Sequence, residues 1–174
     1  MKKWIVTSSI IIGAIVFSAA AVFITFIVLE DKEQPKESKE MAQVEAREEF
    51  KEQTKYMGGE VTLSISEVSD KNSIMEDMHK MTHQKVKSDE KWGAIEMSQA
   101  NIDKLIEILK LKQFEGVDRL KEIAMEWKAG DFSKVVNHHN HIWRTQGGTI
   151  GVAYGIMSPE EEEEFVKNNF REQE

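Results

Sequence analysis

The five histidines of the chain are the residues whose type and spacing offer chemistry, and all of them lie between residues 79 and 141. His79 and His83 are four residues apart on a predicted helix, so their imidazoles can point the same way and bind one metal ion. His139 falls inside the apolar stripe of another predicted helix, where a histidine must hydrogen-bond a partner, ligate something or stay neutral. Together these three residues form one hypothesis, a zinc-type metal site.

A structural role for the same residues is the alternative hypothesis. On a wheel of about 100° per residue, His79 flanks an apolar stripe and His83 lies on the polar side, which is typical of a boundary residue and a solvated one. His139 would then be a core histidine with a hydrogen-bond partner. His138 and His141 fall off the apolar face, and we expect both to be exposed to solvent.

Most catalytic chemistries are excluded or unsupported by the sequence. The chain has no cysteine, which rules out disulfides, thiolate metal sites and cysteine nucleophiles. The tripeptide between His79 and His83 is KMT, so the glutamate of the HExxH metalloprotease motif is missing. The glycines of residues 147–155 match neither GxGxxG nor GxxxxGKS/T, and no serine has a nucleophile-elbow context. A non-enzymatic role without a cofactor is therefore favoured.

The elements that position these residues follow an apolar N-terminal run. Residues 4–29 contain no charged side chain and exceed the roughly 20 residues that cross a hydrocarbon core as a helix. Lys2 and Lys3 precede the run and acidic residues follow it, so the positive-inside rule predicts a cytoplasmic N-terminus and an extracytoplasmic remainder. We expect residues 1–29 to be a signal anchor in the cell membrane, contacting the lipid bilayer through residues 4–29. A signal peptide cleaved near Ala19-Ala20-Ala21 is the alternative.

The chain after the anchor is strongly acidic. Lys2 and Lys3 are two of the 23 basic residues and all 31 acidic residues follow Leu29, so the remainder carries a net charge of −10. This charge argues against nucleic acid as a partner. Residues 30–59 are highly charged and show no sustained apolar stripe, which predicts a partly helical linker. A weak dimer helix is the alternative for this segment.

Residues 60–174 are expected to form an extracytoplasmic all-α domain, a compact bundle of about five helices. The sequence VTLSISEV at 61–68 alternates like a strand, but without a partner strand we interpret it as a lead-in, and TIGVAYGIM at 149–157 as a loop. Ser158-Pro159-Glu160-Glu161 is a capping box with proline at the first helical position. Capping residues and glycines divide the domain into helices from Ser66 to about Lys87, from Ser98, from Val117 to Gly130, from Phe132 to about Gln146, and from Ser158.

Four segments of this domain carry a resemblance to a known family: MHKMTHQKV at 78–86, KWG at 91–93, GDFS at 130–133 and HNHIWRTQGGTIG at 139–151. In these segments the chain resembles a family of short, membrane-anchored proteins of Gram-positive spore-forming bacteria, classed as a domain of unknown function. The resemblance covers roughly residues 66–170 and implies no activity. It draws attention to nine motif positions, which are His79, His83, Trp92, His139, Asn140, Trp143, Gln146, Gly147 and Gly148.

Two functional hypotheses follow from these observations. The first is a non-catalytic interaction domain, tethered outside the cytoplasm where it meets an envelope protein partner; its methionine-rich first helix suits a partner surface. The second is a metal-binding domain of zinc type that uses the three histidines named above. Asn140 and Gln146 could bond the loop after the fourth helix, which is a structural role. The alternative is a polar pocket between the first and fourth helices, formed by Asn140, Gln146, Trp92 and Trp143.

Overall fold

The computed structural model describes residues 36–171, so the predicted anchor lies outside the described residues. Among the residues that are described, no helix is both long and apolar enough to cross a membrane. The chain divides into two compact units between Ala46 and Arg47, and this division falls inside helix α2 (Lys36–Thr54). The second unit contains all the candidate site residues.

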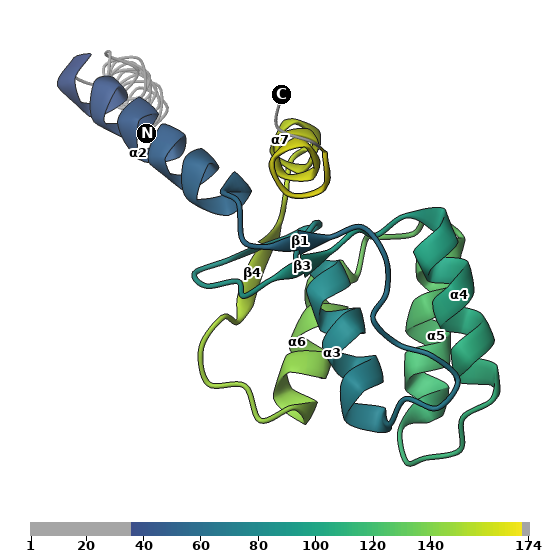
Figure 1. Ribbon diagram of the computed structural model, residues 1–174. Helices are drawn as coiled ribbons and strands as arrows, with labels where there is room; N and C mark the ends of the chain where they lie inside the picture. Colours follow the sequence, from purple (N-terminus) through teal and green to yellow (C-terminus); the bar gives the residue numbers. More distant parts are fainter. Residues whose placement is uncertain (1–35, 172–174) are drawn as a thin grey trace, which may run out of the picture. The chain divides into compact units, whose positions relative to one another are not determined.

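Five helices of this second unit follow α2 (Figure 1). The expectation of a mainly helical fold is therefore confirmed. Helix α3 packs against α6, and α4 packs against α5. The bounds of these helices are α3 Lys71–Thr82, α4 Gln99–Lys110, α5 Val117–Lys128, α6 Val135–Thr145 and α7 Pro159–Phe170.

Two small sheets correct the prediction of an all-α domain. Strand β1 (Gly59–Glu60) pairs in parallel with β3 (Ala94–Ile95). Strand β2 (Val86–Ser88) pairs antiparallel with β4 (Ala153–Ile156), with an irregularity between Lys87 and Ser88. Strands of two to four residues are too short to show an alternating pattern, and β4 lies within the small-residue segment that we expected to be a loop. The segment at 61–68 forms no strand, as predicted.

Capping residues set the starts of two helices as the sequence predicts. Ser98 caps α4, and Ser158 and Glu161 form the predicted capping box of α7. The first helix of the domain is shorter than expected, because Asp70 rather than Ser66 is its N-cap and the helix ends at Thr82 rather than near Lys87. Helix α6 begins at Val135 instead of Phe132.

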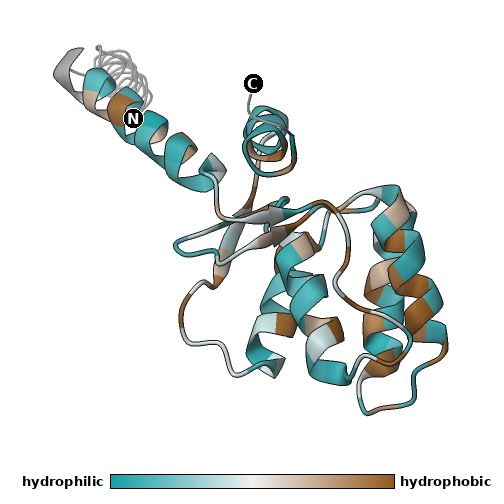
Figure 2. Cartoon of the chain, viewed as in Figure 1, coloured by the Kyte–Doolittle hydropathy of each residue, from teal (hydrophilic) through white to brown (hydrophobic). Residues whose placement is uncertain are grey.

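The main core lies among α3, α4, α5 and α6. Figure 2 shows apolar residues gathered on α4 and α5, whereas α2 is mostly hydrophilic. The predicted stripes are buried, and each large apolar side chain removed from water contributes roughly 1.5–3 kcal/mol. Core members include Ile74, Met78, Met81, Leu105, Leu109, Leu120, Ile123, Trp127 and Ile142.

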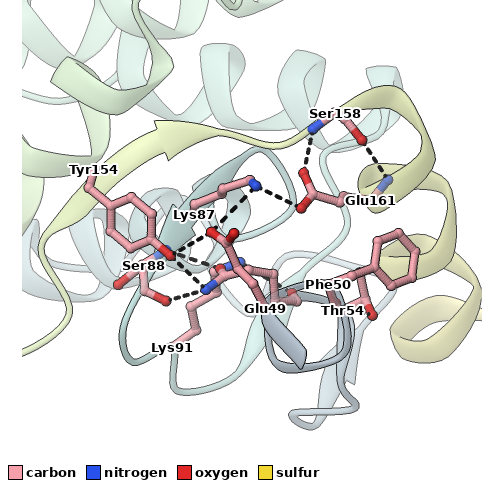
Figure 3. Close-up of polar contacts among 10 residues, drawn as sticks. Glu49, Phe50, Thr54, Lys87, Ser88, Lys91, Tyr154, Ser158 and Glu161 are labelled. Atoms are coloured by element: carbon pink, nitrogen blue, oxygen red, sulfur yellow. Dashed lines mark hydrogen bonds and ion pairs between the residues drawn. The ribbon is translucent and has the colours of Figure 1, made fainter. Parts of the chain in front are cut away.

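The last turns of α2, which belong to the second unit, pack against β2 (Figure 3). The Gln53 side chain donates to the Ser88 carbonyl at 2.8 Å and accepts from the Ser88 N–H at 3.1 Å. Lys87 forms ion pairs with Glu49 at 3.5 Å and with Glu161 at 2.8 Å. Residues 47–54, which we assigned to the linker, therefore contribute hydrogen bonds and ion pairs to the edge of β2.

One buried carboxylate fixes the lead-in to α3. Asp77 is 2 % exposed; it accepts hydrogen bonds from the Ser64 N–H at 2.8 Å, the Ser64 hydroxyl at 2.7 Å and the Ile65 N–H at 3.2 Å. These bonds hold the extended segment along the helix, which explains why residues 66–69 form a turn instead of a first helical turn.

We expect Asp77→Ala to lower the free energy of unfolding by about 3 kcal/mol, because buried donors lose an ionised acceptor. The measurement is urea denaturation followed by circular dichroism. Asp103→Ala is the matched control: Asp103 is also helical and paired, with Lys128 at 2.9 Å, but its side chain is 45 % exposed, and exposed pairs contribute little. Equal effects of the two substitutions would contradict the structural role of Asp77.

Candidate metal centre

The packing of α3 against α6 brings the three predicted ligands together. His79 lies in the last turn of α3, His83 is its C-cap, and His139 lies in the middle of α6. The ring centroids are 4.9 Å apart for His79 and His83, 4.5 Å for His79 and His139, and 5.5 Å for His83 and His139. One ring nitrogen from each residue lies within 4.8 Å of the other two.

Two histidines are more buried than we predicted. His83 is only 4 % exposed, because α3 ends at Thr82 and the His83 ring contacts the carbonyl oxygen of Gly93 at 2.7 Å. His138 is fully buried; it accepts a hydrogen bond from the Trp127 indole N–H at 3.1 Å, and its other nitrogen lies 3.2 Å from Glu126. The prediction of solvent exposure is therefore wrong for both, whereas His141 is half-exposed.

Each histidine of the cluster has an oxygen acceptor at its Nδ1 atom. His79 Nδ1 lies 2.9 Å from the Gln146 side-chain oxygen, and His83 Nδ1 lies 2.7 Å from the Gly93 carbonyl oxygen. These oxygens can only accept, so in both rings the proton is on Nδ1 and the lone pair is on Nε2. The Nε2 atom of His79 is buried and has no hydrogen-bond partner among the described residues.

His139 follows the same pattern at Nδ1 but not at Nε2. Its Nδ1 lies 2.8 Å from the Thr82 hydroxyl oxygen, and that hydroxyl donates to the His79 carbonyl oxygen at 2.6 Å. Its Nε2 lies 3.0 Å from the carbonyl oxygen of Gly151, which also requires a proton. A neutral ring and one hydroxyl supply two protons for three contacts, so one contact is left without a hydrogen.

Burial keeps these rings neutral. Desolvation lowers the pKa of His79, lowers the pKa of His83 well below its usual value, and lowers the pKa of His139 to about 4. The neighbouring His79 adds to this lowering for the other two. Neutral imidazoles are the form that ligates a metal ion, so no proton has to be displaced from a charged ring near pH 7.

A cavity of about 470 Å³ adjoins the cluster. His79 and His83 line it together with the carboxylates of Glu76 and Glu90. Trp92 also lines it; this side chain is 71 % exposed, and its indole N–H donates to Glu90 at 2.8 Å. His79 and His83 therefore border the cavity, whereas His139 is fully buried behind them and does not line it.

The residues of the predicted polar pocket have separate roles in the structure. The Asn140 amide bonds both backbone groups of Ala153, at 2.8 and 2.9 Å, and the Trp143 indole donates to the Ile150 carbonyl at 2.7 Å. These two side chains hold the loop after α6. For Asn140 this is the structural alternative that we considered, whereas Trp143 was not predicted to do so. Gln146 bonds a cluster histidine instead, and Trp92 lines the cavity.

Close packing explains two glycines of this loop. A Cβ atom on Gly148 would lie 2.3 Å from the Trp143 ring nitrogen. Gly151 has a φ of +90°, and its Cβ would lie 2.7 Å from the Glu90 carbonyl oxygen. Both positions need glycine, because any other residue would push the loop, and with it the Gly151 carbonyl, away from His139.

Sequence analysis missed Thr82, Gly93 and Gly151 as partners of the histidines. Thr82 was visible only as one of the residues between His79 and His83. The other two act through backbone carbonyl oxygens, which every residue carries, so no residue type could have indicated them.

The comparison with protein families identifies the family of this chain. The sequence profile of Family of unknown function (DUF6241) matches residues 78–167, more than half of the chain. The chain belongs to this family. The DUF6241 region contains all three clustered histidines together with Thr82 and Gln146, and the predicted membership in a family of unknown function is confirmed. No protein of curated function and no solved structure shows significant similarity to the chain.

The depressed pKa of His139 predicts a pH-dependent stability of the metal-free DUF6241 domain. An imidazole in the unfolded chain takes up a proton near pH 6.5, whereas His139 in the folded protein stays neutral to about pH 4. The unfolded state therefore binds more protons between these values, and the free energy of unfolding should fall by up to about 3 kcal/mol as the pH decreases through this window.

The measurement is urea denaturation at several pH values in the presence of a chelator. His139→Gln removes the titrating group, so its loss of stability between these pH values should be smaller than that of the unchanged protein. Parallel pH profiles for the two proteins would contradict the assigned neutral state.

Proposed function

We propose that this DUF6241 protein binds one divalent metal ion of the zinc type through the Nε2 atoms of His79, His83 and His139. The observation that carries the proposal is the convergence of the three rings. One ring nitrogen of each lies within 4.8 Å of the other two, and in His79 and His83 the Nδ1 atom lies against an oxygen that can only accept. Ligating histidines ordinarily donate their other N–H to a carbonyl, a carboxylate or a similar acceptor, which fixes the tautomer. Imidazole nitrogens suit zinc among the common divalent ions.

The surrounding charges favour a cation. The chain is acidic, the cluster is neutral, and Glu76 and Glu90 line the adjoining cavity. A net negative field raises the local concentration of cations. The unpartnered Nε2 of His79 gives a second reason, because a buried lone pair without a donor is destabilising unless something binds it.

We expect zinc to bind the purified, tag-free protein with one ion per chain, measured by isothermal titration calorimetry and elemental analysis. His79→Ala, His83→Ala and His139→Ala should each abolish stoichiometric binding. Gln146→Leu removes only the acceptor of His79 and should weaken binding roughly 10–100-fold.

His141→Ala is the matched control, since it removes a half-exposed histidine of α6 outside the cluster. Circular dichroism should show that each variant remains helical without metal, because the main apolar core is built from other residues. Zinc binding that survives in all three cluster variants would overturn the proposal.

A second candidate function is a tethered interaction domain, and it is compatible with a metal site. Its support is the uncharged run at residues 4–29 and a row of exposed apolar side chains in and before β4, which are Ile150, Val152, Tyr154 and Ile156. Alternate residues of a strand share one face, so Tyr154 and Ile156 of β4 lie on one face. We propose that their exposed apolar surface contacts an envelope protein partner. In this proposal residues 1–29 hold the domain at the outer face of the cell membrane.

Protease added to intact cells freed of their wall should degrade residues 60–174, because the positive-inside rule places this part outside. A cytoplasmic protein detected in the same samples is the control for intact membranes. Degradation of the domain only after lysis would place it inside the cell and contradict the proposed tether.

A further inference from the structure

The histidine cluster offers three nitrogen ligands to a metal ion. The number of protein ligands determines whether a zinc site is closed or keeps an open position. In the part of the chain that the structure describes, the metal-ligating group consists of His79, His83 and His139 with no fourth member. Structural zinc sites are ordinarily closed by four protein ligands, whereas sites with three protein ligands keep a water in the fourth position. The adjoining cavity of about 470 Å³ provides room for such a water.

The Gly151 carbonyl is the group that competes for this position. Its oxygen lies 3.0 Å from His139 Nε2 and accepts the hydrogen bond of that nitrogen. A zinc ion about 2.0–2.1 Å from the same nitrogen would lie within roughly 1–2 Å of this oxygen. The carbonyl must therefore move when a metal binds, and it either turns away or becomes the fourth ligand.

Ligand preference and packing favour displacement of the carbonyl. Carbonyl oxygens suit magnesium and calcium better than zinc, which prefers imidazole and thiolate. The loop is also fixed on both sides of Gly151, by the Trp143 bond to Ile150 and by the Asn140 bonds to Ala153. A small rotation of the Gly151 peptide breaks the contact of its carbonyl with His139. Ligation of the ion by this carbonyl would instead require the whole loop to reposition.

We infer that the fourth position carries a water facing the cavity, and that the centre hydrolyses uncharged acyl compounds, which are esters or amides. This inference rests on the proposed zinc function. Bound zinc would lower the pKa of a water in this position to about 7. Glu90 lines the cavity and would accept the proton of this water, because the other cavity carboxylate, Glu76, is paired with Lys80 at 2.8 Å. The resulting hydroxide oxygen forms a bond to the acyl carbon, the bond from that carbon to the leaving oxygen or nitrogen breaks, and the proton passes to the leaving group. One water is consumed, and the products are a carboxylic acid and an alcohol or amine.

The lining of the cavity determines the charge of the substrate. Its two carboxylates repel phosphate and sulfate esters, and its one lysine, Lys80, is already paired with Glu76 at 2.8 Å. Trp92 and Ile150 expose apolar surface at the same cavity. An uncharged substrate with an apolar group beside its carbonyl fits this combination of charges and surfaces.

Cobalt substitution tests the open position. Co²⁺ is added to the metal-free protein, the visible spectrum is recorded, and sodium azide is then titrated in. We expect the cobalt bands to shift with azide, because an open position exchanges its water for the anion. A cobalt spectrum that does not respond to azide would show a closed site and overturn the inference alone. Absence of any protein-bound cobalt or zinc would overturn the proposed function as well.

Hydrolysis of two probes tests the substrate class. The zinc-loaded protein should hydrolyse 4-nitrophenyl acetate at least about tenfold faster than free zinc at the same concentration, with a rate that rises to a plateau above pH ~7. His139→Ala should lose this activity and His141→Ala should retain it. Trp92→Ala should raise KM more than it lowers kcat. Faster hydrolysis of bis(4-nitrophenyl) phosphate than of the acetate, or no zinc-dependent hydrolysis of either probe, would overturn the assigned chemistry.

Discussion

Helix α3 buries Ile74, Met78 and Met81 in the main core, and the same helix packs against α6. Since a helix is rigid over three turns, this apolar packing also fixes the position of its last turn along the axis of α6. His79 and His83 are in or next to that turn, and His139 is on the facing helix. The geometry of the histidine cluster therefore depends on the α3–α6 contact, which is stabilised by residues that have no chemistry of their own.

Placing three imidazoles in one buried region creates a demand for polar partners. Each Nδ1 atom lies against an oxygen, from Gln146, Gly93 or Thr82. The Nε2 atoms are not all provided with a hydrogen-bond partner. His79 Nε2 has no partner among the described residues, and the contacts of His139 require one proton more than a neutral ring and one hydroxyl provide. This unmet demand at His79 is one reason for the proposed metal site, although His138 Nε2, outside the cluster, also has no hydrogen-bond partner among the described residues.

The sequence predicted the helical elements well where side-chain type determines structure. The caps at Ser98 and Ser158 and the apolar stripes are recognisable because a hydroxyl at an N-cap and a repeat of 3.6 residues have direct physical causes. The grouping of the three histidines could also be predicted, from the i, i+4 spacing and from a histidine inside an apolar stripe. The burial of His83 could not, because it depends on α3 ending at Thr82 and on a loop from elsewhere in the chain. The contribution of Gln53 was missed for the same reason, since its partner Ser88 lies 35 residues away.

The two small sheets, which the sequence did not reveal, have more influence on the site than their size suggests. Gly93 directly precedes β3 and Gly151 lies two residues before β4, so strand pairing positions both carbonyl oxygens that meet the histidines. Helices thus present the imidazoles, whereas strand ends and loops present their acceptors. Helix packing is difficult to deform, but a single peptide at a loop can rotate at modest cost. This division of roles keeps the three rings together, and under the proposed function it makes the Gly151 peptide the group that has to rotate.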